Sequence, residues 1–170
     1  PMDEHPLIAN VLTPSVSSPS VVSLHNRKET WMLKTYRGSC HCGAVAFEAD
    51  LDLAAGTTRC NCSFCRKVRN WSSRTTPGHL RLVKGKECVA DYAADPLERS
   101  GTPNTHAFCS RCGVRLYSRG DIPELGGAFV SVALSSLDDA DADELIAAPL
   151  TWCDGLNDNW WAPPAETRHL

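Results

Sequence analysis

The sequence Cys60-Asn61-Cys62-Ser63-Phe64-Cys65-Arg66-Lys67 brings three cysteines within six residues. Two shorter clusters flank it, Cys40-His41-Cys42-Gly43 before it and Cys109-Ser110-Arg111-Cys112-Gly113 after it. Seven of the nine cysteines of the chain lie in these three clusters, with one or two residues between neighbouring cysteines. This spacing is typical of thiolates that converge on a tetrahedral metal ion. We therefore predict two zinc sites in one chain.

The number of sulfurs in each cluster suggests how the two sites divide. The outer clusters offer two sulfurs each and would complete a four-cysteine site, with the ligands Cys40, Cys42, Cys109 and Cys112. The middle cluster then forms a three-cysteine site from Cys60, Cys62 and Cys65, with one coordination position free. A closed zinc site is structural, whereas an open one can do chemistry. Gly43 and Gly113 end the two outer clusters, and we expect positive φ at both because glycine adopts it at little steric cost.

Two other uses of the cysteines, disulfides and a redox motif, fit the sequence less well. Disulfides are disfavoured because the number of cysteines is odd, a Cys-x-Cys bridge is strained, and no leader sequence opens the chain. A redox Cys-x-x-Cys at Cys109 and Cys112 lacks the βαβ pattern that such a motif needs. We therefore expect reduced thiols, which predicts a cytoplasmic protein. Cys88 and Cys153 lie outside the clusters and are interpreted as small buried hydrophobic residues.

Composition limits the size and the partners of the protein. The 170 residues suffice for one domain, which we place at 31–170, after an extended arm rich in proline and serine at 1–30. The arm could lie on its own domain, on a second copy in a homodimer, or be ordered only by lattice contacts. A net charge of −3 gives no electrostatic footprint for nucleic acid. No apolar run approaches the ~20 residues of a membrane span.

The hydrophobic pattern predicts a mainly β fold with one or two short helices. Short apolar or alternating runs separated by glycine and proline are typical of antiparallel strands. The expected strands are residues 31–37, 44–48, 57–59, 71–76, 80–83, 88–92, 105–108, 114–119 and 128–134. Ser63 is expected to cap one or two helical turns through Arg69, which would place Cys65 near a helix N-terminus. The pattern further predicts a second helix at 140–147, a loop at 95–104 and an aromatic tail, 152–164, that packs on the domain.

Three segments of the chain resemble a known family. They are residues 38–43, 60–67 and 106–114, which contain all seven clustered cysteines. In order and spacing they resemble the glutathione-dependent formaldehyde-activating enzyme (GFA) family, which shares the zinc-bound β-tent fold with centromere-protein-V-like proteins. The likeness extends over residues 35 to 170 and includes Asp154-Gly155. Residues 68–71 depart from it, because they replace a small glycine-containing stretch.

The resemblance implies a function for each metal site. The outer four cysteines would hold a structural zinc, and Cys60, Cys62 and Cys65 would hold the zinc credited with catalysis. The family reaction joins glutathione and formaldehyde to give S-(hydroxymethyl)glutathione, which is a carbon-sulfur lyase reaction run in the synthetic direction. The resemblance therefore predicts antiparallel β-tent sheets around two zinc ions per chain and a small thiol such as glutathione as substrate.

Residues next to the middle cluster are candidates for substrate binding. Arg66 and Lys67 would offset the charge of a fourth thiolate or bind substrate carboxylates, or would simply be a solvated face. Trp71 would line a pocket or belong to the core. His41 and His106 would support metal ligands or serve only in packing. We find no recognisable general base. Two other functions remain open, a carbon-sulfur lyase for another thiol adduct and a non-catalytic zinc module that binds a protein partner.

Overall fold

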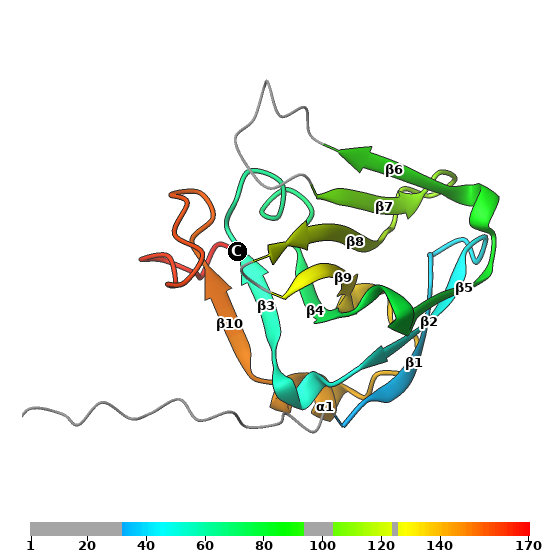
Figure 1. Ribbon diagram of the computed structural model, residues 1–170, viewed down its shortest axis with the longest axis horizontal. Helices are drawn as coiled ribbons and strands as arrows, with labels where there is room; N and C mark the ends of the chain where they lie inside the picture. The colour runs from blue at the N-terminus through cyan, green and yellow to red at the C-terminus, as the bar shows by residue number, and fades with distance from the viewer. Residues whose placement is uncertain (1–31, 94–103, 124–125) are drawn as a thin grey trace, which may run out of the picture.

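The computed structural model describes residues 32–93, 104–123 and 126–170 (Figure 1). Within these ranges the chain forms ten strands in two sheets and one α-helix, which confirms the prediction of a mainly β protein. The predicted arm at 1–30 and all but the last residue of the predicted loop at 95–104 lie outside the described residues. No helix among the described residues is long and apolar enough to cross a lipid bilayer.

The smaller sheet has three antiparallel strands. They are β1 (Lys34–Ser39), β2 (Ala46–Leu51) and β5 (Leu80–Lys84), in the order β1-β2-β5. Along β2 buried residues alternate with partly exposed ones, as expected of a strand with one face on the core. The connection between β1 and β2 carries the first cysteine cluster.

The larger sheet has seven strands in the order β10-β3-β4-β9-β8-β7-β6. Their bounds are β3 (Thr57–Cys60), β4 (Trp71–Thr75), β6 (Val89–Ala93), β7 (Thr105–Cys109), β8 (Arg115–Ile122), β9 (Gly127–Ala133) and β10 (Leu150–Cys153). Neighbouring strands are antiparallel except for β10, which runs parallel to β3. The most apolar predicted strand, 128–134, corresponds to β9 in the middle of the sheet. The middle cluster lies on the connection from β3 to β4, and the third lies between β7 and β8.

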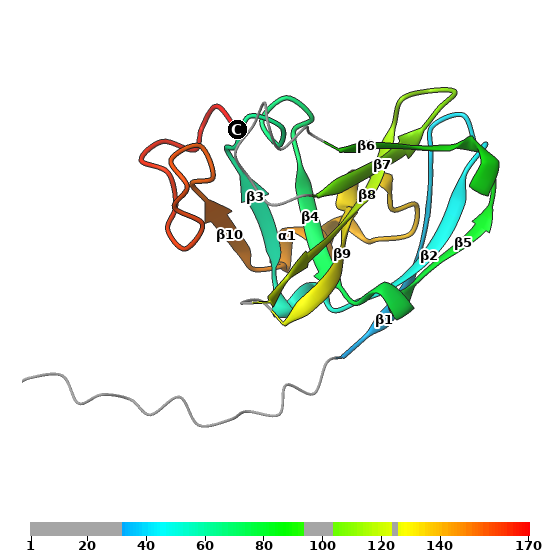
Figure 2. The same ribbon diagram turned by 45° about the horizontal axis from the view of Figure 1, so that its top comes forward.

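The two sheets share one hydrophobic core. In both Figure 1 and Figure 2 the three-stranded sheet lies on one side of the molecule and the β10–β3 edge of the larger sheet lies on the other. Phe47 of β2 meets Tyr117 of β8 edge-to-face, with ring centroids 6.5 Å apart, and Leu116 and Val132 are fully buried beside them. Burial of each such side chain contributes about 1.5–3 kcal/mol.

Helices are few and short. α1 (Ala142–Ala147) corresponds to the predicted helix at 140–147, with Asp141 as its N-cap, and it ends before Pro149. The short 3₁₀ turns are η1 (Leu53–Ala55), η2 (Pro77–His79), η3 (Lys86–Cys88) and η5 (Leu134–Ser136).

The predicted helical turns after Ser63 form only in part, because Arg66 N–H and Val68 N–H donate to the carbonyls four residues back but residues 63–69 are turns rather than a continuous helix. Asn70 N–H bonds Cys65 O at 2.9 Å, five residues back, and Arg69 has a left-handed φ of 50°. The backbone therefore widens and reverses before a second helical turn can form. Cys65 consequently has no helix N-terminus beside it.

Candidate metal centres

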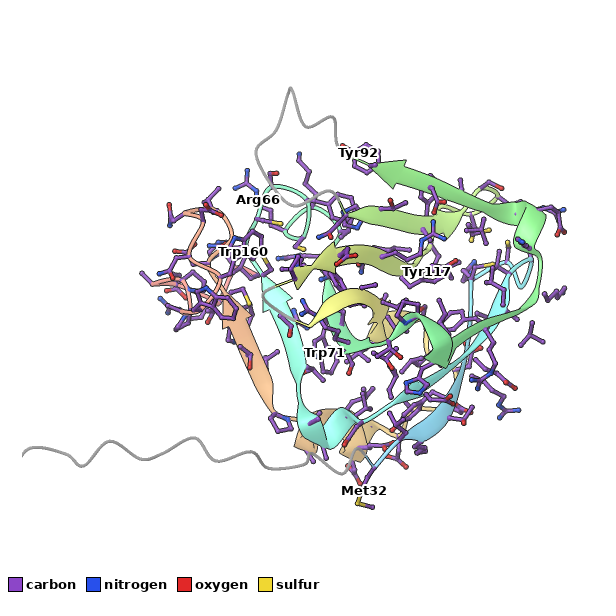
Figure 3. The ribbon with its side chains drawn as sticks, viewed as in Figure 1. Met32, Arg66, Trp71, Tyr92, Tyr117 and Trp160 are labelled. Atoms are coloured by element: carbon purple, nitrogen blue, oxygen red, sulfur yellow. The ribbon has the colours of Figure 1, made fainter. Side chains whose placement is uncertain are left out.

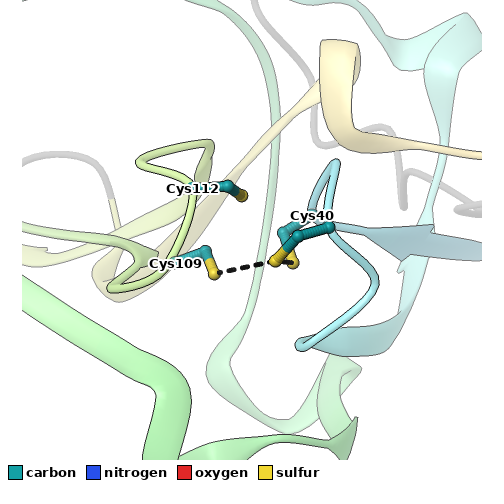
Figure 4. Close-up of side chains that lie close together, drawn as sticks. Cys40, Cys109 and Cys112 are labelled. Carbon is teal, nitrogen blue, oxygen red and sulfur yellow. Dashed lines mark hydrogen bonds between the residues drawn. The ribbon is translucent and has the colours of Figure 1, made fainter.

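The outer cysteines converge from the two sheets. Cys40 and Cys42 lie at the connection from β1 to β2, Cys109 ends β7, and Cys112 lies in the turn that follows. Their four sulfurs lie within 4.8 Å of one another. Figure 4 shows Cys109 and Cys112 turned toward Cys40 across the space between the two connections. The fold thus assembles four thiols from segments far apart in the sequence.

The sulfur spacing of this cluster fits a tetrahedral metal site. Cys40 Sγ and Cys42 Sγ are 3.6 Å apart, and Cys42 Sγ and Cys109 Sγ are 3.8 Å apart. A zinc ion with Zn–S bonds of ~2.3 Å separates its ligands by roughly 3.8 Å, the edge of the tetrahedron. Four sulfurs at this spacing, without a disulfide among them, suit a closed zinc site.

The backbone of the two outer connections shows why each cluster ends in glycine. Gly43 and Gly113 have φ of 68° and 75°, which confirms the predicted positive φ. Gly43 N–H donates to Cys40 O, three residues back, at 2.9 Å, and Gly113 N–H donates to Cys109 O, four residues back, at 2.8 Å, so each glycine closes a turn on the first cysteine of its cluster. In the first of them Val45 N–H donates to Cys40 Sγ at 3.2 Å. A backbone donor of this kind stabilises the thiolate form of a ligand.

The middle cluster is built by one connection alone. Cys60 ends β3, and Cys62 and Cys65 lie in the turns that follow, with the three sulfurs within 4.8 Å of one another. Among residues 32–93, 104–123 and 126–170, no fourth histidine, cysteine, aspartate or glutamate reaches this group. The chain thus offers three sulfurs here, a donor set that suits zinc with its fourth position open to another molecule.

Hydrogen bonds shape the acidity of the three thiols. The pKa of the Cys62 thiol is lowered to about 2, because the thiols of Cys60 and Cys65 donate to its sulfur and Cys65 N–H adds a donor at 3.4 Å. The pKa of Cys60 is raised to about 11 by its hydrogen bond with Cys62, and the pKa of Cys65 is also raised. The hydrogen bonds therefore favour the thiolate form at Cys62 over Cys60 and Cys65.

An aromatic stack supports the loop between the cysteines. The Phe64 ring lies on His106 of β7, with centroids 3.6 Å apart, and on Tyr92 of β6 at 5.9 Å. Burial, and then the charge of Arg115, lower the pKa of His106 to about 4, so this ring is neutral at pH 7. His106 therefore packs against the loop, which was one of its two predicted roles. His41 is exposed.

The C-terminal segment closes the other side of the middle cluster. Asn61 is buried and donates from Nδ2 to Asp154 Oδ1 at 2.5 Å, while its Oδ1 accepts from Leu156 N–H at 2.9 Å. Gly155 lies so near that a Cβ atom there would be 2.8 Å from Cys60 Sγ. The predicted docking of the tail holds at these residues, whereas Trp161 is 77% exposed.

The candidate substrate-binding residues have different environments. Arg66 and Lys67 are exposed, and Figure 3 shows Arg66 on the outside of the loop. Trp71 packs against the core and donates from Nε1 to Thr57 Oγ1 at 2.9 Å. The structure therefore places Arg66 and Lys67 at the surface and leaves Trp71 half-buried against the core, and the part of all three in substrate binding stays a prediction.

The two remaining cysteines differ from each other. Cys88 is buried in the core, which confirms its interpretation as a small hydrophobic residue. Cys153 is only partly buried and pairs in register with Cys60 across β10 and β3. Neither belongs to the two sulfur groups.

Several residues around the middle cluster were missed by sequence reasoning. Asn70 donates from Nδ2 to Cys65 Sγ at 3.6 Å, and Arg115 donates to Asn70 Oδ1. Asn61 and Asp154 join the loop to the C-terminal segment. The sequence indicates these two asparagines only by their positions. Asn61 lies between Cys60 and Cys62, and Asn70 directly precedes the predicted strand at 71–76.

A β fold that brings together a four-thiol cluster and a three-thiol cluster is typical of proteins whose cysteines can hold metal ions. The sequence profile of the family described as glutathione-dependent formaldehyde-activating enzyme matches residues 35–154, and the chain belongs to this family. It is a family of formaldehyde-activating enzymes, which confirms the resemblance read from the cysteine clusters.

Two individual relatives support the assignment. A Halomonas elongata protein, provisionally named a glutathione-dependent formaldehyde-activating enzyme, is 33% identical over 105 residues, which are 59% of this chain and 66% of that protein. The match therefore spans just under two thirds of that relative. A crystal structure of a Rhodobacter sphaeroides protein superposes with a TM-score of 0.55 and 28% identity, over 68% of this chain and 99% of that one.

Proposed function

We propose that this chain is a zinc-dependent carbon-sulfur lyase that joins glutathione and formaldehyde to give S-(hydroxymethyl)glutathione. The observation that carries the proposal is the middle cluster, in which three sulfurs converge without a fourth protein ligand among the described residues. Membership of a formaldehyde-activating family supports the choice of substrates. The outer cluster, with four sulfurs, would hold the structural metal.

The roles of the residues follow from their positions. Cys60, Cys62 and Cys65 would hold the catalytic zinc, which when bound supplies a Lewis acid at which an arriving thiol loses its proton. Asn61 and Phe64 keep the loop in place through the C-terminal segment and the His106 ring. Their contacts fix the direction from which a substrate can approach the sulfurs.

The reaction itself balances without a further reactant. The glutathione sulfur, having lost its proton, forms a bond to the formaldehyde carbon. The π electron pair of the carbonyl moves to oxygen, which takes up one proton, so that one hydroxymethyl thioether forms. The proton released by the thiol equals the proton taken up, and no oxidant is needed. The role of this chain is to supply a thiolate at pH 7, where a free thiol with a pKa of ~8.5 is mostly protonated.

Exposed positive charge supports the choice of an anionic thiol. Arg66 and Lys67 lie on the loop that carries the ligands, and Arg66 lies on its outer side (Figure 3). We assign them a part in attracting glutathione carboxylates through solvent. Trp71 has no such part in this proposal, because its side chain is engaged with Thr57. Reduced, metal-binding thiols also suit the cytoplasm.

The test is a calorimetric titration of reduced glutathione into protein that holds two zinc ions per chain. We expect binding with release of a proton, measured as a dependence of the heat on the ionisation enthalpy of the buffer. S-methylglutathione is the matched control, because it keeps the carboxylates but has no thiol proton. Formaldehyde consumption is then measured with both compounds.

Equal binding of the two compounds, without proton release, would contradict the proposal. Binding and turnover of another thiol in place of glutathione would keep the chemistry and change the substrate. The departure from the family pattern at residues 68–71 makes this the second candidate function. Of these residues, Arg69 donates to the carbonyl of His169, so this part of the loop contacts the C-terminal segment.

A further inference from the structure

Arg115 is the first residue of β8, and its side chain contacts Asn70, on the same connection as the middle cluster. The register between β7 and β8 shifts at Ala107 and Phe108, so that Phe108 pairs with Arg115 while Ala107 pairs with Tyr117. The Arg115 side chain is mostly buried and donates from Nη1 to Asn70 Oδ1 and from Nη2 to Ser118 Oγ at 3.3 Å. A bulge in the sheet thus brings a guanidinium group under the loop that carries the cysteines.

Asn70 connects this guanidinium to one of the three sulfurs. Its backbone N–H donates to Cys65 O at 2.9 Å, and its side-chain Nδ2 donates to Cys65 Sγ at 3.6 Å. An arginine can only donate, so the bond from Arg115 requires that the amide oxygen of Asn70 faces it. The amide nitrogen must then face Cys65. Arg115 therefore determines that Asn70 presents a donor to the sulfur.

The charge of Arg115 has no acidic partner in the described residues. The ion pairs found there join carboxylates to Lys34 or to other arginines, for example Asp139 to Arg37 and Asp91 to Arg119. Burial lowers the pKa of Arg115, and the nearby Cys65 and Cys62 raise it. Its Nε atom is buried and has no hydrogen-bond partner in the part of the chain that the structure describes. The positive charge is therefore without a carboxylate partner there and is joined to Cys65 Sγ through the side chain of Asn70.

A charge in this position would matter more than the exposed charges on the loop. Three thiolates and one divalent cation sum formally to −1, and a substrate thiolate makes the sum −2. Arg66 and Lys67 are exposed, and solvent and salt screen their effect. A buried charge acts through an effective dielectric constant of about 20 rather than ~80, so its attraction is several times stronger at equal distance.

We propose that Arg115 is a positioning residue of the three-cysteine cluster. Through Asn70 it holds a hydrogen-bond donor on Cys65 Sγ, and its buried charge offsets the negative charge that accumulates when a thiolate joins the three sulfurs. The part that concerns the thiol rests on the proposed function. The part that concerns the binding of metal by the cluster does not.

The test uses full-length protein with zinc in the four-cysteine cluster and cobalt(II) in the three-cysteine cluster. Cobalt affinity is measured by competition with a chelator, and thiol binding by the change in the sulfur-to-cobalt charge-transfer band. Arg115→Met is expected to weaken both cobalt and glutathione binding by about 10–100-fold, the usual effect of losing a partner of a metal ligand. Arg119→Met, at an exposed arginine of the same strand, is the matched control, and we expect less than a twofold change for it.

Two further variants separate position from charge. Arg115→Lys keeps the charge but loses the planar fork, so it is expected to weaken cobalt binding more than thiol binding. Asn70→Ala keeps Arg115 and removes the donor to Cys65, and it is expected to shift the charge-transfer band.

The outcomes distinguish this inference from the proposed function. Wild-type cobalt affinity in both Arg115→Met and Asn70→Ala would overturn the inference, whatever the thiol does. If Arg115→Met does not fold, Asn70→Ala alone decides: an unchanged band and an unchanged affinity would overturn it. Absence of thiol binding to the wild-type protein would refute the proposed function and leave the metal measurements intact.

Discussion

The two cysteine clusters differ in how much of the fold each one needs. Cys42 and Cys109, which lie in sulfur contact in the outer cluster, are 67 residues apart and belong to connections of different sheets. The middle cluster draws its three sulfurs from six consecutive residues of one loop. A ligand lost from the outer cluster weakens a link between the two sheets, whereas a ligand lost from the middle cluster affects one loop. We expect stability to depend on the first cluster and reactivity on the second.

The largest effect is expected from exchanging single ligands in the two clusters. Cys109→Ser replaces a fully buried sulfur that joins the sheets, and it should lower the free energy of unfolding by more than about 4 kcal/mol, as loss of a metal site can do. Cys62→Ser should lose one metal ion per chain and keep the fold. The measurements are urea unfolding and metal content.

Equal loss of stability in the two variants would break the comparison. It would show that the middle cluster also holds the fold together, as the non-catalytic zinc module requires. The matched control is Cys88→Ser, which alters a core cysteine outside both clusters and should leave the metal content at two ions per chain.

A smaller effect is expected from a methyl group at the boundary between loop and tail. A Cβ on residue 155 would lie 2.8 Å from Cys60 Sγ and 2.7 Å from the Trp160 ring. Gly155→Ala should therefore cost about 1–3 kcal/mol, the usual cost of overpacking, and release the metal of the middle cluster first. Metal release is followed with a chelator and an indicator dye.

The control for that experiment is Gly43→Ala, at a glycine where a Cβ would meet no atom within 4 Å. Its positive φ still makes the substitution cost about 1–2 kcal/mol. Similar losses of stability would sharpen the comparison if Gly155→Ala releases metal from the middle cluster and Gly43→Ala releases it from the outer cluster. Release from the same cluster in both variants would contradict it.

A third effect is expected at the aromatic stack of Phe64, His106 and Tyr92, which packs against the loop of the middle cluster. Phe64→Leu removes the ring that lies on His106 and should cost about 0.5–1.5 kcal/mol beyond the lost area. Because Phe64 lies between Cys62 and Cys65 in the sequence, metal should leave this cluster faster, while the outer one is unaffected. Trp161→Leu, at an exposed ring, is the control and should change neither rate. A slower or unchanged rate in Phe64→Leu would show that the stack does not support the cluster.

The smallest effect is expected in the three-stranded sheet, whose β1–β2 connection carries Cys40 and Cys42 of the outer cluster. Hydrogen bonds from Arg81 and then Thr35 hold the pKa of Asp50 below its usual range. A carboxylate with a lowered folded-state pKa stabilises the fold above the unfolded value of ~3.9, and this contribution is lost as the pH falls below it.

Asp50→Asn should therefore lower stability by less than about 1 kcal/mol at pH 7, because the Arg81 side chain is largely exposed. The difference from the wild type should shrink as the pH falls through about 4. Urea unfolding of both proteins at several pH values measures it, and the comparison cancels the acid-induced loss of thiolate ligands. A difference that grows as the pH falls would contradict the assigned sign.

The sequence predicted the grouping of the cysteines because short spacing limits where a sulfur can reach. It predicted the strand at 128–134 because continuous apolar residues suit the middle of a sheet. The helical turns predicted after Ser63 form only in part, because local propensity does not show that the backbone widens at the bond from Asn70 N–H to Cys65 O. The roles of Asn70 and Arg115 could not be predicted, since they depend on a shift of one residue in the pairing of β7 with β8.

The parallel pairing of β10 with β3 also fixes an order of events during synthesis. The ligands of the outer cluster have all been made once Cys112 has left the ribosome, but β8 and β9 in the middle of the larger sheet follow it. Strand β10, and Asp154 and Gly155 beside the middle cluster, come later still. Because a domain folds as a unit, the larger sheet and the surroundings of the middle cluster are completed together, near the end of synthesis. A newly made chain would thus gain its fold and its reactive site at the same stage.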